Sequence, residues 1–355
     1  MGSRPRVWLA LILVLLGVIG FSLYPRRPVE YRSDRFLMDT LVSIKVYGRD
    51  DEKLRKAVAE AYAEMQRIAD LTNRFPARGT AEHAASDVCR INDMAGIKPV
   101  TVDPDVFAML ERSRTWRHRT GGAFDVTIGP VMDLWGFGGK HPHVPKHDEL
   151  VARLALVGSD RLLLKSRDRT AFLEKAGMGL DLGAAAKGYA TEKAMRVLER
   201  NGIEKAIIDA GGTIRVLGKN PEGTPWRIGI KNPADSGGIL AVLALEDSAA
   251  ATSAGYYRCF DSGRNRFHHI LNPGTGYPAM ENASVTVVAK DAGMADILST
   301  ALFVLPPEKA LETVKKLAGV EVFLVTVDGR TLHGKGPASR SVVQSADPEH
   351  HAQSR

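Results

Sequence analysis

A carboxylate and a hydroxyl lie four residues apart in the last third of the chain, at Asp296 and Thr300. This spacing places both side chains on one face of a helix, and their apolar neighbours predict a largely buried helix over 292–305. A buried carboxylate needs a partner, and two hard oxygen ligands suit Mg²⁺, which keeps other positions for water and phosphate. Alternatively, Thr300 bonds the carbonyl one turn earlier and Asp296 pairs with a lysine. From the spacing alone, this second interpretation is favoured.

The segment GLDLGAAAKGYA, residues 179–190, is a second candidate. A short apolar stretch ends at Asp181, Gly183 allows a turn, and a helix is expected over 184–201. The free N–H groups of a helix N-terminus favour an anion such as phosphate, and Lys187 adds a positive charge there. The segment is not a Walker A loop. A tight strand-to-helix turn, with Asp181 merely near a cap, explains the same residues equally well.

Two further segments combine glycine with aromatic or histidine side chains. The double glycine of 121–130 lets the backbone approach a ligand closely, and Trp135 and Phe137 follow. These rings could cover a flat ligand, although aromatics are more often core residues. In 266–276, His269 precedes a Pro/Gly turn and could donate to a phosphate or move a proton. A structural histidine fits that position as well.

Composition excludes several classes of protein. The 355 residues allow one large domain or two sub-domains that share a cleft. With 44% hydrophobic and 25% charged residues, the chain is not largely disordered. Its two cysteines, Cys89 and Cys259, cannot build a disulfide scaffold or a Cys-rich zinc site. Residues 1–33 carry +4 of the net charge of +7, so the remaining +3 does not indicate nucleic-acid binding.

The N-terminal segment, residues 1–33, is interpreted as a membrane anchor. Two arginines precede an uncharged apolar run from Val7 to Leu23, which is marginal for a membrane span and long for a signal peptide. Because no small-residue cleavage site follows, we expect an uncleaved anchor in the inner membrane with the body facing the periplasm or cell exterior. Arg26 and Arg27 on the far side oppose this orientation, and a cleaved signal peptide is the alternative.

The body, residues 34–338, mixes hairpins with helices and lacks a regular alternation of strand and helix, which favours an α+β fold with mixed, largely antiparallel sheets. Helices are expected over 51–71, 103–117, 184–201, 292–305 and 307–316, and strands over 36–47, 206–209, 213–217, 226–230, 240–246, 267–271, 284–289 and 320–325, with a hairpin over 161–175. A loop is expected over 136–146, and the polar tail, 339–355, is expected to be disordered.

Taken in order, the chemical segments resemble those of the FAD:protein FMN transferases, the ApbE family, over roughly residues 36–325. The matching pieces are 38–41, 64–68 with Phe75, 86–92, 121–138, 181–190, 211–212, 251–254, 268–276 and 295–301. Each piece is weak alone, but the ordered set is specific. The resemblance implies two α/β sub-domains that flank a cleft.

The resemblance also implies an activity. FAD would bind with Mg²⁺, its pyrophosphate would be cleaved, and FMN would pass to a Thr or Ser hydroxyl of an acceptor protein, such as a subunit of a membrane redox complex, with release of AMP. A non-enzymatic FAD carrier, an FAD pyrophosphatase and a structural assembly factor are the alternatives.

The resemblance further implies a role for individual residues. The metal ligands would be the Ala184 carbonyl and the side chains of Asp296 and Thr300, and the flavin contacts would be Met38, Phe75, Ala123, Phe124, Asp125, Asp181, Lys187 and Ile270. The base that takes the acceptor proton is either His269 or Asp181. The chain departs from the family pattern at Asp39, at Phe75 where Tyr is common, and at Asn272 where Asp is frequent.

Overall fold

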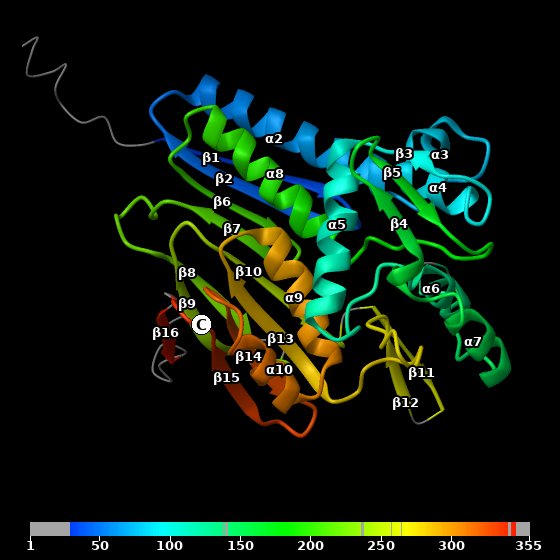
Figure 1. Ribbon diagram of the computed structural model, residues 1–355. Coiled ribbons are helices and arrows are strands. Elements are labelled where there is room, and N and C mark those ends of the chain that lie inside the picture. The colour runs from blue at the N-terminus through cyan, green and yellow to red at the C-terminus, as the bar shows by residue number, and fades with distance from the viewer. Residues whose placement is uncertain are drawn as a thin grey trace, which may run out of the picture.

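An antiparallel sheet of eight strands forms the centre of the molecule in the computed structural model (Figure 1). The structure describes residues 29–137, 139, 141–235, 238–256, 258–263, 265–339 and 342–345. In spatial order the strands are β1 (Val29–Leu37), β2 (Thr40–Gly48), β6 (Lys205–Ala210), β7 (Thr213–Leu217), β10 (Ala249–Ala254), β13 (Asn282–Ala289), β14 (Glu321–Thr326) and β15 (Thr331–Lys335). The pairs β1–β2, β6–β7 and β14–β15 are hairpins, whereas longer connections join the other neighbours, and the longest, residues 49–204, separates β2 from β6.

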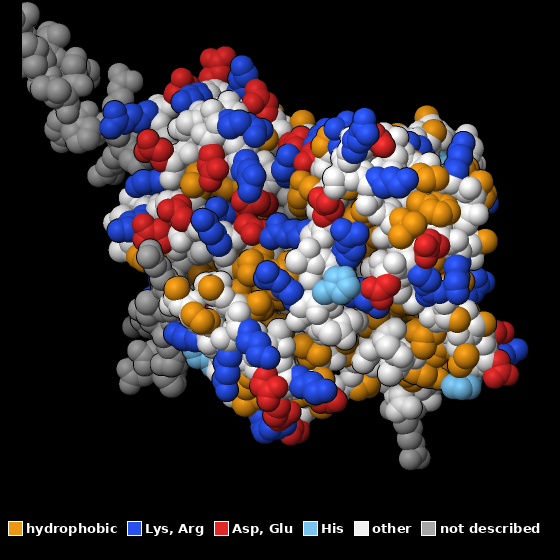
Figure 2. Space-filling view, in the orientation of Figure 1, with side chains coloured by type: hydrophobic (Ala, Val, Ile, Leu, Met, Phe, Trp, Pro, Cys, Tyr) orange, Lys and Arg blue, Asp and Glu red, His pale blue; other side chains and the backbone are white. Residues whose placement is uncertain are grey.

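Three helices pack on one face of this sheet: α2 (Asp51–Thr72), α8 (Ala186–Arg200) and α9 (Ala292–Val304). The helix α2 begins where the Asp50 side chain accepts a hydrogen bond of 3.1 Å from the Lys53 N–H, a favourable N-cap. Its apolar positions recur at helical spacing and are buried. By contrast, α9 is buried almost all round, as expected for a helix inside the core. Figure 2 shows Lys and Arg side chains interspersed with Asp and Glu over the outer surface of α2, α8 and α5.

A second sheet covers the opposite face of the large one. It contains β16 (Val342–Ser345), β9 (Ile239–Leu245) and β8 (Trp226–Lys231). The two faces can be told apart along β14, where Phe323 packs toward β8 and β9 while Val322 and Leu324 join the core beneath the helices. This alternation is the period of a strand buried on both faces.

The remaining elements surround one end of the sheet. They are α3 (Ala81–Ala85), α4 (Asp87–Asp93), β3 (Val100–Thr101), α5 (Pro104–Arg119), α6 (Gly129–Trp135), α7 (His147–Leu154), the short 3-10 helix at Ser159–Arg161, β4 (Leu162–Lys165), β5 (Thr170–Leu173), β11 (Cys259–Ser262) and β12 (Asn265–His268). The last helix, α10 (Pro307–Val314), packs instead on β14 and β15. The largest apolar cluster continues from the eight-stranded sheet to α5, β4 and β5, so these two parts share one core.

The α+β fold with largely antiparallel sheets is confirmed, but one predicted strand is wrong. Residues 36–47 do not form a single strand, because the chain reverses at Met38 and Asp39 between β1 and β2. Both residues are left-handed, with φ of 52° and 58°, which is the backbone of a two-residue hairpin turn. Such turns usually contain Gly or Asn, so these side chains gave no turn signal.

Other elements were not expected from the sequence. Residues 249–254 form β10 in the middle of the large sheet although their sequence is AAATSA, which has a low β propensity. Helices α3, α4, α6 and α7 were also missed, and α6 and α7 flank the expected loop over 136–146. In the tail expected to be disordered, Val342–Ser345 form β16, because the edge of β9 offers backbone groups to pair with.

The apolar run of the predicted anchor, residues 7–23, lies outside the described residues, whereas residues 29–33 of the same predicted segment belong to β1. Within the part of the chain that the structure does describe, no helix has the length and apolar character that crossing a membrane requires.

Candidate active site

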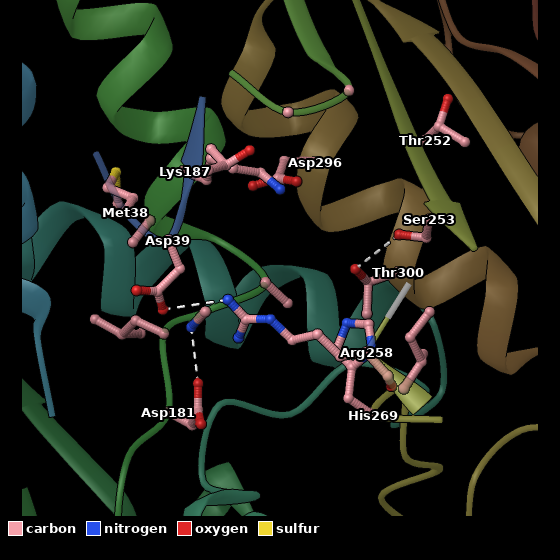
Figure 3. A pocket seen from close by; sticks show the side chains of 18 of the residues that line it. Met38, Asp39, Asp181, Lys187, Thr252, Ser253, Arg258, His269, Asp296 and Thr300 are labelled. Atoms are coloured by element: carbon pink, nitrogen blue, oxygen red, sulfur yellow. Dashed lines mark hydrogen bonds and ion pairs between the residues drawn. The ribbon is translucent and has the colours of Figure 1, made fainter. Parts of the chain in front are cut away.

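A cavity of about 1520 Å³ lies at the end of the large sheet that carries the β1–β2 and β6–β7 turns. All the residues predicted from the sequence to do chemistry line it: Met38, Phe75, Ala123, Phe124, Asp125, Asp181, Ala184, Lys187, His269, Ile270, Asp296 and Thr300. They come from segments spread over more than 260 positions of sequence, yet the fold brings them together around one cavity (Figure 3). Their individual roles remain predictions.

The candidate metal ligand Asp296 lies where α9 crosses the start of α8. Its side chain is buried, and it accepts hydrogen bonds from the Gly188 N–H at 2.7 Å and from the Thr213 hydroxyl at 3.3 Å. Burial raises the pKa of this carboxyl, while the positive charge of Lys187 opposes the rise. A side chain at position 188 would not fit, because a Cβ there would lie 2.4 Å from the Ala292 carbonyl oxygen and from the Asp296 Cβ.

The second candidate ligand, Thr300, lies one turn further along α9. Its hydroxyl is 3.2 Å from the Ser253 hydroxyl, which in turn is 2.9 Å from the Ser299 hydroxyl. Thr300 and Ser253 point toward one another across the cavity wall in Figure 3. The hydroxyl therefore faces the cavity side of β10, where it can turn toward a ligand.

A divalent cation such as Mg²⁺ requires several oxygen ligands, and the protein supplies few of them around Asp296. Among the described residues, no group of three or more His, Cys, Asp or Glu side chains is placed to hold a metal. The oxygens present are one buried carboxylate, the Thr300 hydroxyl and the backbone around Ala184. One or two carboxylates completed by water and substrate phosphate are the usual environment of Mg²⁺. The residues therefore fit Mg²⁺ bound together with a phosphate ligand.

The predicted flavin contacts differ in how far they are exposed. Phe75 is 56% exposed and so can stack on a flat ring, whereas Phe124 and Ile270 are buried and shape the cavity floor. Met38 reaches the cavity from the strained β1–β2 turn. Asp39, in the same turn, forms an ion pair of 3.2 Å with Arg258 across the cavity mouth (Figure 3).

Asp125 differs from the other predicted contacts, because its carboxylate is occupied by protein groups. It accepts hydrogen bonds from the Arg117 Nε at 2.6 Å, from the Thr127 hydroxyl at 2.7 Å and from the Ser159 N–H at 3.0 Å. Burial acts to raise the pKa of Asp125, but the hydrogen bonds from Ser159 and Thr127 outweigh it, so the pKa lies below its ordinary value. Asp125 therefore holds the loop that presents Ala123 and Phe124.

The two candidates for the base have different surroundings. Burial and the nearby charge of Arg258 lower the pKa of His269 to about 4, so its imidazole is neutral at physiological pH. Its Nδ1 lies 3.3 Å from the Arg258 carbonyl oxygen. Asp181 accepts hydrogen bonds from the Arg74 guanidinium at 3.0 Å and from the Gly183 N–H at 2.8 Å, so each of its oxygens already has a donor.

Sequence patterns missed the lining residues Arg74 and Arg258, and they gave no role to Thr252 and Ser253 although 251–254 was one of the matching pieces. Arg74 directly precedes Phe75, so its position beside a predicted contact was the available signal. Arg258 lies in an irregular segment with no recognisable pattern, and only the folded chain brings it to the cavity.

Comparison with known proteins decides the family. The ApbE family model matches residues 38–324, which is most of the chain. The chain belongs to the ApbE family. A relative named FAD:protein FMN transferase from Klebsiella pneumoniae (strain 342) is 34% identical over 83% of this chain and 89% of its own. A second so named, from Treponema pallidum (strain Nichols), is 31% identical over 95% of each chain.

Solved structures of ApbE proteins have the same fold. The crystal structure of the ApbE protein of Thermotoga maritima superimposes with a TM-score of 0.79 at 31% identity, covering 86% of this chain and 97% of that one. The flavin transferase ApbE of Vibrio cholerae superimposes with a TM-score of 0.75 at 28% identity, with the same coverage. The shared fold thus extends over 86% of this chain and nearly all of each solved structure.

Proposed function

We propose that this protein is an FAD:protein FMN transferase that attaches FMN to a Thr or Ser hydroxyl of an acceptor protein and releases AMP. The observation that carries the proposal is the convergence of the family's site residues on one cavity. Relatives at 31–34% identity over most of both chains bear this name, and the cavity volume of about 1520 Å³ is large enough for a dinucleotide.

The proposed reaction exchanges a phosphoanhydride bond of FAD for a phosphoester bond to the acceptor. The acceptor oxygen attacks the phosphorus of the FMN half, a new O–P bond forms, and the bond from that phosphorus to the bridging oxygen breaks. The bridging oxygen and its electron pair leave with AMP, while the hydroxyl proton passes to a base. Attack on a pyrophosphate is slow because its negatively charged oxygens repel the attacking oxygen. The site must therefore neutralise the charge of the pyrophosphate.

His269 is the base we favour. Its imidazole is neutral at physiological pH, and it lines the cavity close to Thr300 and Arg258. Asp181 is held by Arg74 and Gly183 through both oxygens, which suits a fixed hydrogen-bond acceptor for FAD better than a group that takes up a proton. Lys187 and the N-terminal end of α8 supply positive charge beside Asp296.

Mg²⁺ would be held by the Asp296 carboxylate, the Thr300 hydroxyl and the Ala184 carbonyl. When bound, the ion supplies charge neutralisation at the phosphate oxygens. The chain itself keeps the Asp296 carboxylate in place through the Gly188 N–H and the Thr213 hydroxyl. A Thr300 hydroxyl shared with Ser253 can turn from that neighbour toward an incoming ligand.

One experiment tests the proposed function directly. The full-length protein is incubated with FAD, Mg²⁺ and a candidate acceptor subunit of a membrane redox complex, and the acceptor is weighed by mass spectrometry. We expect the acceptor to gain one FMN and lose water, with AMP released in equal amount. Free FMN and AMP with an unchanged acceptor would instead indicate a pyrophosphatase, and intact bound FAD would indicate a carrier.

We also propose that residues 7–23 anchor the body outside the cytoplasm, at the inner membrane. The support is the uncharged apolar run after two arginines and the absence of a small-residue cleavage motif behind it. Protease added to spheroplasts should degrade the body while a cytoplasmic marker protein survives, and alkaline carbonate should leave the protein in the membrane fraction. Release by carbonate would favour the cleaved signal peptide.

A further inference from the structure

Arg74 is a largely buried cation that lines the cavity beside Asp181. It follows the end of α2, and only 10% of its side chain is exposed. Its guanidinium donates to Asp181 at 3.0 Å and to Asp133, on α6, at 2.7 Å. Its Nε is buried and has no hydrogen-bond partner among the described residues. All three of these residues line the cavity.

The position of Arg74 joins separate parts of the site. Its guanidinium carbon lies 5.4 Å from the centre of the Phe75 ring. Arg74 and Asp133 also line a second cavity of about 570 Å³, so the guanidinium lies in the wall between the two. One side chain therefore fixes Asp181, α6 and the segment that carries Phe75 relative to one another.

Asp181 depends on this contact. The side chain of Asp181 is 14% exposed, and one oxygen accepts from Arg74 while the other accepts from the Gly183 N–H. A buried carboxylate that loses its cation becomes an uncompensated charge and reorients toward water. The planar guanidinium of Arg74 holds its N–H donors in fixed directions, so it orients the Asp181 carboxylate as well as neutralising its charge.

We propose that Arg74 is a positioning residue for FAD: by holding Asp181 and the wall beside Phe75, it sets the affinity of the cavity for FAD. This inference rests on the proposed function, because it takes FAD to be the ligand. It assigns Arg74 no part in bond breaking, since its donors already bind protein carboxylates. The prediction is a change in FAD affinity with little change in turnover once FAD is saturating.

The test measures the dissociation constant of FAD by flavin fluorescence for the full-length protein and for Arg74→Gln. We expect Arg74→Gln to raise the constant about tenfold, and Arg74→Lys to have an intermediate effect because a single ammonium cannot bridge both carboxylates. In transfer assays, the KM for FAD should rise in parallel while kcat stays within about threefold of the wild type.

Coupling to Asp181 separates positioning from general stabilisation. If Arg74 acts through Asp181, the double variant Arg74→Gln/Asp181→Asn should bind FAD no more weakly than Asp181→Asn alone. The matched control is Arg215→Gln, because Arg215 is 8% exposed, pairs with Glu192 at 3.1 Å and does not line the cavity. That control should lower the melting temperature and leave the FAD constant unchanged.

Two results would overturn the inference. One is an FAD constant for Arg74→Gln within about twofold of the wild type, and the other is a double variant whose effect equals the product of the single effects. If Arg74→Gln does not fold, Arg74→Lys and the Asp181→Asn cycle built on it decide the question in the same way. Failure of the wild-type protein to bind FAD would contradict the proposed function instead.

Discussion

The carboxylate of Asp296 accepts a hydrogen bond of 2.7 Å from the backbone N–H of Gly188, and this contact joins α9 to the first turn of α8. One oxygen of the candidate metal ligand therefore also completes the start of a helix, where N–H groups lack partners within the helix. The same close approach leaves no room for a side chain at Gly188. The separation of these two helices and the position of the carboxylate are thus set together.

Replacement of Gly188 by alanine should disturb both the separation of α8 and α9 and the position of the Asp296 carboxylate. A Cβ at this position would lie 2.4 Å from the Ala292 carbonyl oxygen, so the helices must move apart, and we expect a loss of about 3 kcal/mol in the free energy of unfolding. Urea denaturation followed by circular dichroism measures the change. Gly293→Ala is the control, since its Cβ would meet no backbone atom within 4 Å among its three nearest contacts, which are side-chain atoms of Arg112 at 3.2 Å and of Asp291 at 3.4 Å. Equal stability of Gly188→Ala and the wild type would refute the packing argument.

Asp296 can be tested without disturbing the helix start. In Asp296→Asn, the amide oxygen can still accept from Gly188 but no longer carries a charge, so we expect FMN transfer to fall by at least about 100-fold. Asp296→Ala should do the same and also lose about 1 kcal/mol of stability with the cap. In-gel flavin fluorescence of the acceptor reports transfer. Fluorescent acceptor formed by either variant would show that the metal assignment is wrong.

Asp125 predicts a dependence of stability on pH. Its pKa in the folded protein lies below the ordinary value of 3.8, so the native state binds fewer protons than the unfolded state over that interval. Its contribution is therefore complete above the ordinary pKa and is lost as the pH falls through the folded value. We expect Asp125→Asn to be about 3 kcal/mol less stable at pH 7, because the partly buried Arg117 loses the buried one of its two carboxylate partners.

The pH series provides the check on Asp125. The difference in unfolding free energy between the wild type and Asp125→Asn should begin to shrink below about pH 4, where the Asp125 carboxylate of the unfolded chain takes up a proton before that of the folded protein does. Asp160→Asn is the control, since Asp160 is the other, 61% exposed partner of Arg117, and an exposed pair contributes less than about 1 kcal/mol. A difference that is constant from pH 7 to pH 3 would contradict this prediction.

His269 should titrate far below an ordinary histidine in the ligand-free protein. Burial and the charge of Arg258 lower its pKa to about 4, so NMR of the imidazole protons should show a midpoint near that pH. Arg258→Gln removes the cation and should raise the midpoint, although burial keeps it below the ordinary value near 6.5. A wild-type midpoint near 6.5 would show that the imidazole is open to water and weaken its case as the base.

Much of the fold could be predicted because the local signals were strong. The helix α2 begins at Asp51, as the sequence indicated, because a capping residue and a clean apolar face mark it. The break between β1 and β2 could not be predicted, since Met38 and Asp39 are held in left-handed backbone by the surrounding sheet and not by their own preferences. The alanine-rich β10 is likewise a strand because of its neighbours, β7 and β13.

The site was predicted where the family pattern supplied residues, and missed where a contact depends on distant segments. Arg74 and Asp181 are 107 positions apart in the sequence, and nothing in the residue type of either one predicts that the two form an ion pair. Spacing alone had favoured a backbone bond for Thr300, whereas its hydroxyl faces Ser253, which arrives from another strand. Short patterns thus identify the participants, while their pairing depends on how the sheet and helices pack.

The long insertion between β2 and β6 has a consequence for the order of assembly. Hairpins such as β1–β2 and β14–β15 close between residues that are near in sequence, but β2 meets β6 only after residues 49–204 have been looped out. Closing a long loop is slow because its entropy must be lost before contacts compensate. The cavity needs both sides of that loop, so the capacity to hold a nucleotide should emerge last during maturation of each new chain.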